Sequence, residues 1–277
     1  MNIGIRLHDT LPGTLAQRLA YAKGQGFSCA HLALSKALPD FPMADAPRLL
    51  TEELAEKVRA DFAAQGMECA VLGCYLNLAD PDEESRRRTQ EIYRAHLRFC
   101  RMIGARVVGT ETYANPNSRF AEPAGESEEA FGLFLSSLRP VVRWAEEEGA
   151  ALAIEPVWNH IISTPECAER MLDAVKSDNL QIILDSVNLL STATAPRAEE
   201  IVEDALRRLG DRVRILHMKD YVMRPGEANV AAVACGQGEM RYEALVAFAK
   251  ARDIPMTLEN TRPDNAEAAR QYLEQFA

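Results

Sequence analysis

Four side chains of metal-ligating type occupy equivalent places in the second half of the 277-residue chain. They are Glu155, Asp185, His217 and Glu259, and each closes a short apolar run. The runs recur at intervals of 30 to 42 residues, a spacing typical of one β-strand followed by one helix. Three carboxylates and one imidazole suit one divalent cation, with Mn²⁺, Mg²⁺ or Co²⁺ favoured by the oxygen-rich set and Zn²⁺ also accepted. The chain is therefore predicted to be a metal-dependent enzyme.

The elements that position these residues alternate along the whole chain. Apolar strand-like runs are followed by amphipathic helical stretches, a pattern typical of parallel β/α architecture. Eight such units in 277 residues predict one (β/α)8 TIM barrel domain over 1–277. The carboxyl ends of barrel strands converge on one mouth, so the four side chains are expected at one rim. The predicted strands cover 2–8, 29–34, 68–76, 105–112, 151–157, 180–187, 213–221 and 255–260.

Capping signals mark several helices, and long segments follow several strands. Helices are predicted over 51–66, 81–104, 127–149 and 164–177, each beginning with a capping residue or an acidic first turn. Long loops are predicted over 35–50, 113–126 and 222–239. Because all three loops follow strands, they are expected at the rim and over a substrate.

The alternation of side chains along a strand tests the metal hypothesis. Residues i and i+2 share a face, so Glu155 shares its face with Ala153, and His217 with Ile215 and Lys219. Modest side chains on this face fit a barrel lumen that opens at a metal. Acidic residues at strand ends also cap helices or face solvent, and for a single residue that explanation is the commoner one. Four ligand-type residues in one phase favour the metal site.

Four sequence tracts resemble a known superfamily. They are Ile154-Glu-Pro-Val157 followed by His160, Leu184-Asp-Ser-Val-Asn-Leu-Leu190, Leu216-His-Met-Lys-Asp220 and Leu258-Glu-Asn260. They are similar to tracts of the xylose-isomerase-like barrel superfamily of sugar and sugar-phosphate isomerases and epimerases. The order Glu, Asp, His, Glu resembles that of the ketose 3-epimerases, and His-Met-Lys-Asp resembles the corresponding tract of the inosose dehydratases. The resemblance implies one cation held by these four side chains, with Glu155 and Glu259 as the catalytic acid and base.

Two departures keep the reaction open. Asn188 stands where the ketose epimerases have a substrate-binding His, and Arg224 lies one residue beyond the position of their Arg. A cation that polarises an α-hydroxyketone favours an enediolate, which leads to epimerisation, isomerisation or dehydration. The sequence therefore predicts a metal-dependent sugar or sugar-phosphate isomerase or epimerase. The alternatives are an inosose-dehydratase-like lyase and, less favoured, an abasic-site endonuclease or a non-catalytic binding barrel.

Candidate substrate-binding residues lie near the predicted ligands. They are His8, His160, Asn188, Lys219 and Trp158. Lys219 suits a buried ion pair equally well, and Trp158 suits packing under the rim as well as stacking on a sugar. His31 and His96 are expected to be structural. The Gly236-Gln-Gly-Glu239 tract has backbone amides for a phosphate, but a glycine-rich turn is the commoner explanation.

Composition limits the partners. With 31 Lys and Arg against 41 Asp and Glu, the net charge of −10 disfavours nucleic acid, and five histidines are few for the three zinc ions of an abasic-site endonuclease. No apolar run approaches the roughly 20 residues of a membrane helix, and the amino terminus lacks signal-peptide features. Six scattered cysteines read as buried thiols. We expect a cytoplasmic protein, with no membrane partner, acting on a small sugar, sugar phosphate or cyclitol; a homo-oligomer is compatible with the sequence.

Overall fold

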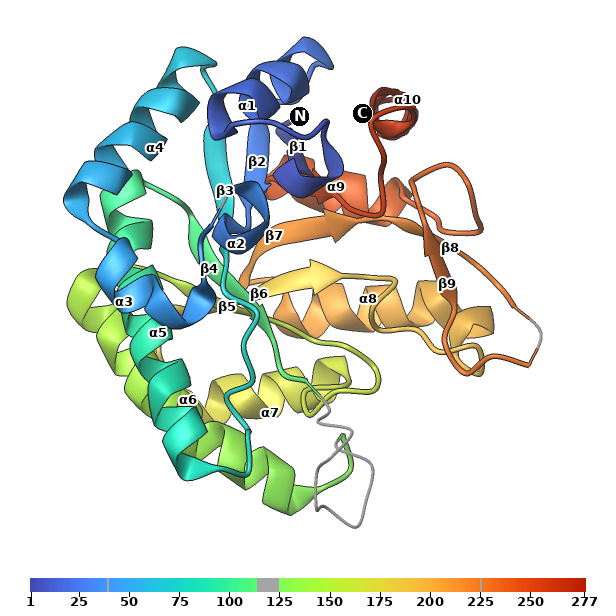
Figure 1. Cartoon of the computed structure of the whole chain (residues 1–277). Helices are drawn as coiled ribbons and strands as arrows, with labels where there is room; N and C mark the ends of the chain where they lie inside the picture. Colours follow the sequence, from blue (N-terminus) through green and yellow to red (C-terminus); the bar gives the residue numbers. More distant parts are fainter. Residues whose placement is uncertain (39, 114–124, 225) are drawn as a thin grey trace.

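A closed parallel barrel forms the centre of the molecule. The computed structural model describes residues 1–38, 40–113, 125–224 and 226–277. Within these residues eight strands close in the order β1-β10-β7-β6-β5-β4-β3-β2. The labelled strands β1 to β7 lie together inside the ring of helices (Figure 1). The barrel strands are β1 Ile3–Arg6, β2 Cys29–Leu32, β3 Glu68–Gly73, β4 Val107–Glu111, β5 Leu152–Glu155, β6 Leu180–Asp185, β7 Val213–Met218 and β10 Met256–Leu258. This confirms the predicted (β/α)8 TIM barrel.

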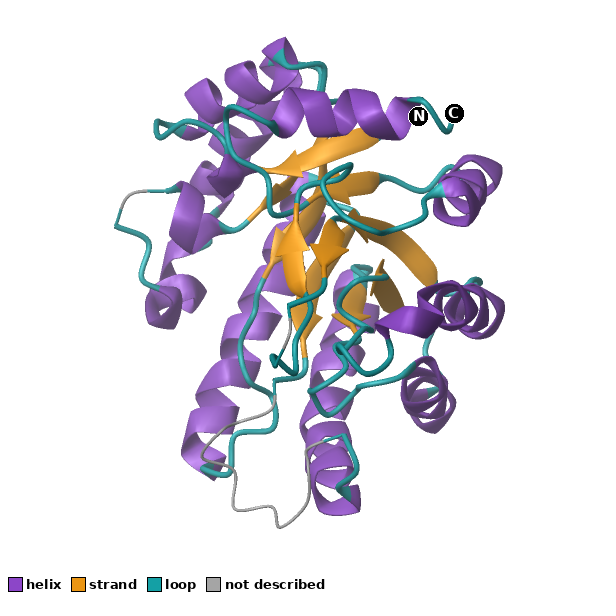
Figure 2. Ribbon diagram, turned by 90° about the vertical axis from the view of Figure 1, so that its right-hand side faces the viewer, coloured by secondary structure: helices purple, strands orange, loops and turns teal. Residues whose placement is uncertain are grey.

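Helices surround the strands on the outside (Figure 2). The α-helices are α1 Leu15–Gly24, α2 Leu34–Ala37, α3 Ala46–Leu49, α4 Glu52–Ala64, α5 Glu83–Ile103, α6 Glu128–Glu148, α7 Pro165–Val175, α8 Ala198–Leu209, α9 Glu243–Arg252 and α10 Ala266–Glu274. Short 3-10 turns occupy Leu7–Asp9, Met43–Asp45 and Ala195–Arg197. No helix in the described part of the chain is both long and apolar enough to cross a bilayer.

The four predicted helices form because their ends carry the expected caps. The side chains of Thr51, Asp82, Ser127 and Thr164 each accept a hydrogen bond from a backbone N–H in the first turn of α4, α5, α6 and α7. Gly104 and Gly149 end α5 and α6 in the left-handed conformation, which glycine adopts without a steric cost. The capping residues predicted from the sequence therefore cap these helices in the structure.

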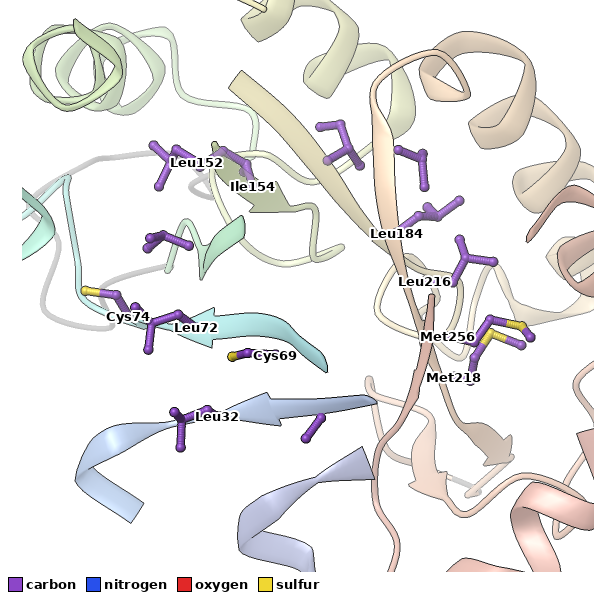
Figure 3. Close-up of a cluster of buried hydrophobic side chains, with 14 of the residues drawn as sticks. Leu32, Cys69, Leu72, Cys74, Leu152, Ile154, Leu184, Leu216, Met218 and Met256 are labelled. Carbon is purple, nitrogen blue, oxygen red and sulfur yellow. The ribbon is translucent and has the colours of Figure 1, made fainter. Parts of the chain in front are cut away.

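Side-chain alternation divides the barrel strands into a narrow lumen and a thick outer core. Ala153, Ile183 and Ile215 belong to a small cluster inside the barrel. Leu152 and Ile154 point the other way and join the large cluster between strands and helices (Figure 3). The predicted placement of modest side chains inside and larger ones toward the helices is confirmed for β5.

Some strand ends differ from the predicted ones, and the difference affects His8 most. Strand β1 ends at Arg6, and His8 lies in the 3-10 turn Leu7–Asp9 rather than on a strand. After β7 the chain leaves the barrel and forms an antiparallel hairpin of β8 (Asp220–Val222) and β9 (Ala231–Val233). Residues 114–124 of the predicted loop 113–126 lie outside the described residues. All six cysteines are free thiols, and five of them are buried.

Candidate active site

The four predicted ligands converge at the carboxyl ends of neighbouring strands. Glu155 and Asp185 are the last residues of β5 and β6, His217 precedes the end of β7, and Glu259 follows β10 directly. All four side chains are buried. The Nδ1 atom of His217 lies 3.0 Å from Oε2 of Glu155 and 3.2 Å from Oε1 of Glu259. Ligand atoms of Glu155, Asp185 and His217 lie within 4.8 Å of one another. Ligand atoms of Glu259, His217 and His31 form a second such group, so the four predicted residues meet around His217.

Hydrogen bonds fix the orientation of two of the carboxylates. Oδ1 of Asp185 accepts from the backbone N–H groups of Val187 and Asn188 at 2.9 and 3.0 Å, because the chain turns sharply after β6. The side-chain amide of Asn188 donates to Oε1 of Glu155 at 2.6 Å. The other oxygen of Glu155 faces His217, and the other oxygen of Asp185 faces Lys219.

Lys219 is a buried counter-charge to these carboxylates. Its Nζ atom lies 2.9 Å from Oδ2 of Asp185 and 3.4 Å from Oε2 of Glu259, and it donates to Oδ1 of Asn188 at 2.7 Å. Burial alone would lower the pKa of Lys219, but the neighbouring carboxylates outweigh burial and raise it. The side chain is an ammonium group, so the buried ion pair that the sequence left open is present.

The charge of the set fits one divalent cation. Three carboxylates and one ammonium group sum to −2 when His217 is neutral. Oδ2 of Asp185 is buried against Nζ of Lys219, and Nδ1 of His217 is buried against the carboxylates of Glu155 and Glu259. Nε2 of His217 is buried and has no hydrogen-bond partner among the described residues. Burial disfavours a charged His217, yet Glu155 and Glu259 raise its pKa to about 9. The centre thus attracts positive charge, which a proton or a metal ion can supply, and its donor atoms are of the types that divalent cations bind.

A cavity of about 290 Å³ opens beside the ligand set, on the side of β1 to β4. It is lined by Arg6, His8, His31, Ala33, Ser35, Lys36, Met43, Gly73, Tyr75, Leu76, Glu111, Tyr113 and Glu259. Glu259 therefore belongs both to the ligand set and to the cavity wall. Two larger hollows, of about 740 and 770 Å³, are lined by none of the four predicted ligands. Through Glu259, the 290 Å³ cavity adjoins the predicted metal ligands.

The predicted substrate-binding residues fall into three places. His8 lines the cavity. Asn188 and Lys219 are bonded to the predicted ligands, and neither is among the residues that line the cavity. His160 stacks on Tyr113, with ring centroids 5.5 Å apart. The Trp158 indole N–H donates to Asn229 at 3.1 Å, and Trp158 is not part of the cavity lining.

Several residues of this region were not singled out from the sequence. Arg6 lies 3.3 Å from Glu259, and Glu111 pairs in register with Glu155 on the neighbouring strand. Burial, followed by the charges of Glu155 and Glu259, raises the pKa of Glu111 to about 8. His31, expected to be structural, faces the site. Side-chain alternation was the available signal for it, because His31 lies two residues after Cys29, which packs inside the barrel.

The glycine-rich tract before α9 binds a carboxylate of the protein itself. Backbone N–H groups of Gly236, Gly238 and Met240 donate to the side chain of Asp220 at 3.0, 3.0 and 2.8 Å. A Cβ atom at Gly238 would lie 2.0 Å from the carbonyl oxygen of Tyr221, so only glycine fits there. These amides hold Asp220 rather than a phosphate, which supports the turn interpretation of the tract.

Comparisons with known proteins agree with the barrel fold. A "Probable endonuclease 4" from Thermotoga sp. (strain RQ2) is 22% identical over 245 residues, covering 83% of this chain and 82% of the relative. The apo structure of a 3-keto-D-glucoside 4-epimerase from E. coli aligns with a TM-score of 0.76 and 18% identity, covering 99% of both chains. A zinc-bound IOLI protein aligns with a TM-score of 0.74 and 19% identity, covering 100% of this chain and 96% of that chain. At such identities these structures show a shared fold.

The family assignment comes from the sequence itself. The family model described as "Xylose isomerase-like TIM barrel" matches residues 19–276, which is nearly the whole chain. The match includes β2 to β10, and with them the whole ligand set. The chain belongs to the xylose isomerase-like TIM barrel family.

Proposed function

We propose that this chain is a divalent-metal-dependent sugar or sugar-phosphate isomerase or epimerase that transfers protons through an enediolate. The observation that carries the proposal is the buried ligand set with a charge of −2 beside a cavity that shares Glu259 with it. The proposed ligands are Glu155, Asp185, His217 and Glu259. Mn²⁺, Mg²⁺ or Co²⁺ is the favoured ion, and Zn²⁺ is compatible with the donors.

Glu155 and Glu259 are the proposed proton-transfer pair. When bound, a divalent cation polarises two adjacent substrate oxygens and acidifies the C–H bond between them. The two carboxylates approach His217 from β5 and from the end of β10, so they face a bound substrate from different directions. One carboxylate removes the proton, and the other returns a proton to the opposite face or to the neighbouring carbon.

The surroundings of the two carboxylates differ. Glu155 has a neutral amide, that of Asn188, on its outer oxygen. Oε2 of Glu259 faces two cations, Arg6 at 3.3 Å and Lys219 at 3.4 Å. Because nearby cations stabilise a carboxylate and weaken it as a base, we assign proton removal to Glu155. Glu259 then delivers a different proton, one that it takes up from solvent, and the proton held by Glu155 is lost to solvent to complete the cycle.

A metal-dependent lyase of inosose-dehydratase type is the second candidate. The observation that favours it is the ammonium group of Lys219 between Asp185 and Glu259, since a buried cation at this place can donate a proton to a departing hydroxyl group. His8, His160, Asn188, Lys219 and Trp158 stay predicted substrate contacts. A small sugar, sugar phosphate or cyclitol stays the predicted substrate, and the cytoplasm the predicted location.

Solvent isotope incorporation tests the proposal. Protein treated with EDTA and reloaded with Mn²⁺ is incubated in D₂O with C4 to C6 ketoses and keto-inositols. A proton-transfer enzyme places deuterium on the reacting carbon, and Glu155→Gln and Glu259→Gln lose most turnover while remaining folded. Full retention of substrate hydrogen would indicate a hydride shift instead, and an unsaturated or deoxy product would indicate the lyase. Glu239→Gln, on an exposed loop position, is the control.

A further inference from the structure

The aromatic ring of His31 is held in one orientation on the cavity side of the ligand set. It stacks on His217, with centroids 5.4 Å apart and planes at 14°, and on Tyr75, at 5.7 Å and 27°. Gly73 leaves the space that the ring fills, because a Cβ atom there would lie 2.7 Å from Nε2 of His31. The ring is thus confined by its neighbours rather than by hydrogen bonds.

Both ring nitrogens of His31 are buried without a partner among the described residues. The side chain is only 2% exposed, and it lines the cavity. A buried polar group without a partner is costly, so such groups are normally satisfied by protein, water or ligand. The neighbouring His8, at 6.2 Å between ring centroids, also has a buried Nδ1 without a partner.

We propose, on the basis of the function proposed above, that His31 binds hydroxyl groups of a polyhydroxylated substrate, at carbons away from those that react. A neutral imidazole has one N–H donor and one acceptor nitrogen. A hydroxyl group both donates and accepts, so a substrate hydroxyl can satisfy either ring nitrogen. The cavity joins His31 to Glu259, which places these hydroxyls next to the reacting end of the substrate.

A second cation is the competing occupant, since ligand atoms of His31, His217 and Glu259 also lie within 4.8 Å of one another. Charge argues against it. The charge of −2 on the ligand set is already balanced by one divalent cation, and Arg6 lies 3.3 Å from Glu259. A second divalent ion would leave the centre positively charged.

The experiment measures binding, so it does not depend on turnover. The dissociation constants of D-fructose, D-tagatose and the four-carbon L-erythrulose are determined by calorimetry on Mn²⁺-loaded protein, for wild type and His31→Leu. We expect His31→Leu to weaken binding of the six-carbon ketoses at least tenfold and that of L-erythrulose less than threefold. His31→Gln, which keeps a donor and an acceptor, should recover part of the loss. His96→Leu, which removes a buried histidine on α5, should change neither the binding of the six-carbon ketoses nor that of L-erythrulose.

A spectroscopic measurement locates the contact. Because the chain has five histidines, ¹⁵N-histidine NMR is simple to assign by substitution. In protein loaded with diamagnetic Mg²⁺, adding D-tagatose should shift the ring nitrogens of His31. Gly73→Ala, which keeps His31 but crowds it, should weaken binding as His31→Leu does. An unshifted His31, equal losses for four- and six-carbon ketoses, or no binding of any ketose to wild type would overturn the proposal. Loss of metal from His31→Leu would show that His31 is a ligand instead. Ketose binding with a shifted His31 but no deuterium incorporation would refute only the proton-transfer function.

Discussion

The ammonium group of Lys219 lies 2.9 Å from Oδ2 of Asp185, within the set of side chains that we assign to the metal. Both side chains are buried. Lys219 therefore reduces the negative charge of the set before any cation binds, and the strength of cation binding depends on a residue that is not itself a ligand.

Replacing Lys219 tests this dependence. Lys219→Met removes the ammonium group that pairs with Asp185 and Glu259, and breaking a buried ion pair typically costs about 3 to 5 kcal/mol. We expect the metal-free variant to unfold at a lower temperature, and Mn²⁺ to raise its Tm more than that of wild type, because the cation replaces the lost charge. Thermal unfolding with and without Mn²⁺ measures both effects. Lys250→Met, at an exposed position of α9, is the control. An equal Mn²⁺-induced rise in both proteins would contradict the role of Lys219.

The ligand assignment predicts metal content. Asp185→Asn and His217→Ala should each lose the bound ion on dialysis, because each removes a charged or strongly coordinating donor from a set of four. Elemental analysis of the dialysed proteins gives the stoichiometry. Asp178→Asn, whose side chain is 95% exposed, should retain the metal of wild type. Unchanged metal content in both site variants would refute the assignment.

Asp220 should affect stability rather than metal binding. Its carboxylate accepts hydrogen bonds from the N–H groups of Gly236, Gly238 and Met240, which close the segment between β9 and α9. An amide at this position cannot accept on both atoms, so Asp220→Asn should lower the free energy of unfolding by roughly 2 to 3 kcal/mol. Urea denaturation measures this loss. A normal stability, or a loss of metal without a loss of stability, would be contrary to this role.

His96 is expected to cause part of the pH dependence of stability. It is fully buried in α5, where burial lowers its pKa to about 4, although Nδ1 bonds the carbonyl of Ile92 at 2.8 Å. In the unfolded chain His96 takes up a proton near pH 6.5, whereas in the folded chain it takes one up only near pH 4. The free energy of unfolding therefore decreases as the pH falls from about 6.5 to about 4. His96 accounts for a loss of about 3 kcal/mol in the free energy of unfolding over that pH range. Urea denaturation of wild type and His96→Gln between pH 4 and 7 should show a smaller decrease for the variant. If the free energy of unfolding changed equally with pH in both proteins, His96 would not be the cause.

The fold was predictable because barrel strands and helix caps leave local signals. Thr51 and Thr164 cap the helices that the sequence marked, and the ends of β5 and β6 fall at Glu155 and Asp185. The convergence of the four proposed ligands follows from the parallel topology. The pairing of Lys219 with Asp185 did not follow, because strand phase gives the face of a side chain but not its partner.

Contacts made by the first half of the chain were harder to predict from the sequence. Arg6, His31 and Glu111 come from strands without a recognisable motif, yet they line the cavity beside Glu259. Their nearness depends on closure of the barrel, which pairs β1 with β10 over more than 250 residues of sequence. A local pattern cannot report such a contact.

The position of Glu259 has a consequence for the order of assembly. It follows the last barrel strand, and that strand pairs on one side with β7 and on the other with β1. During synthesis Glu155, Asp185 and His217 leave the ribosome first, and they gain their fourth partner only when β10 enters between β1 and β7. Arg6 then meets Glu259 across the same seam. We therefore expect the proposed metal site to be completed late in the folding of the nascent chain, only after the barrel has closed.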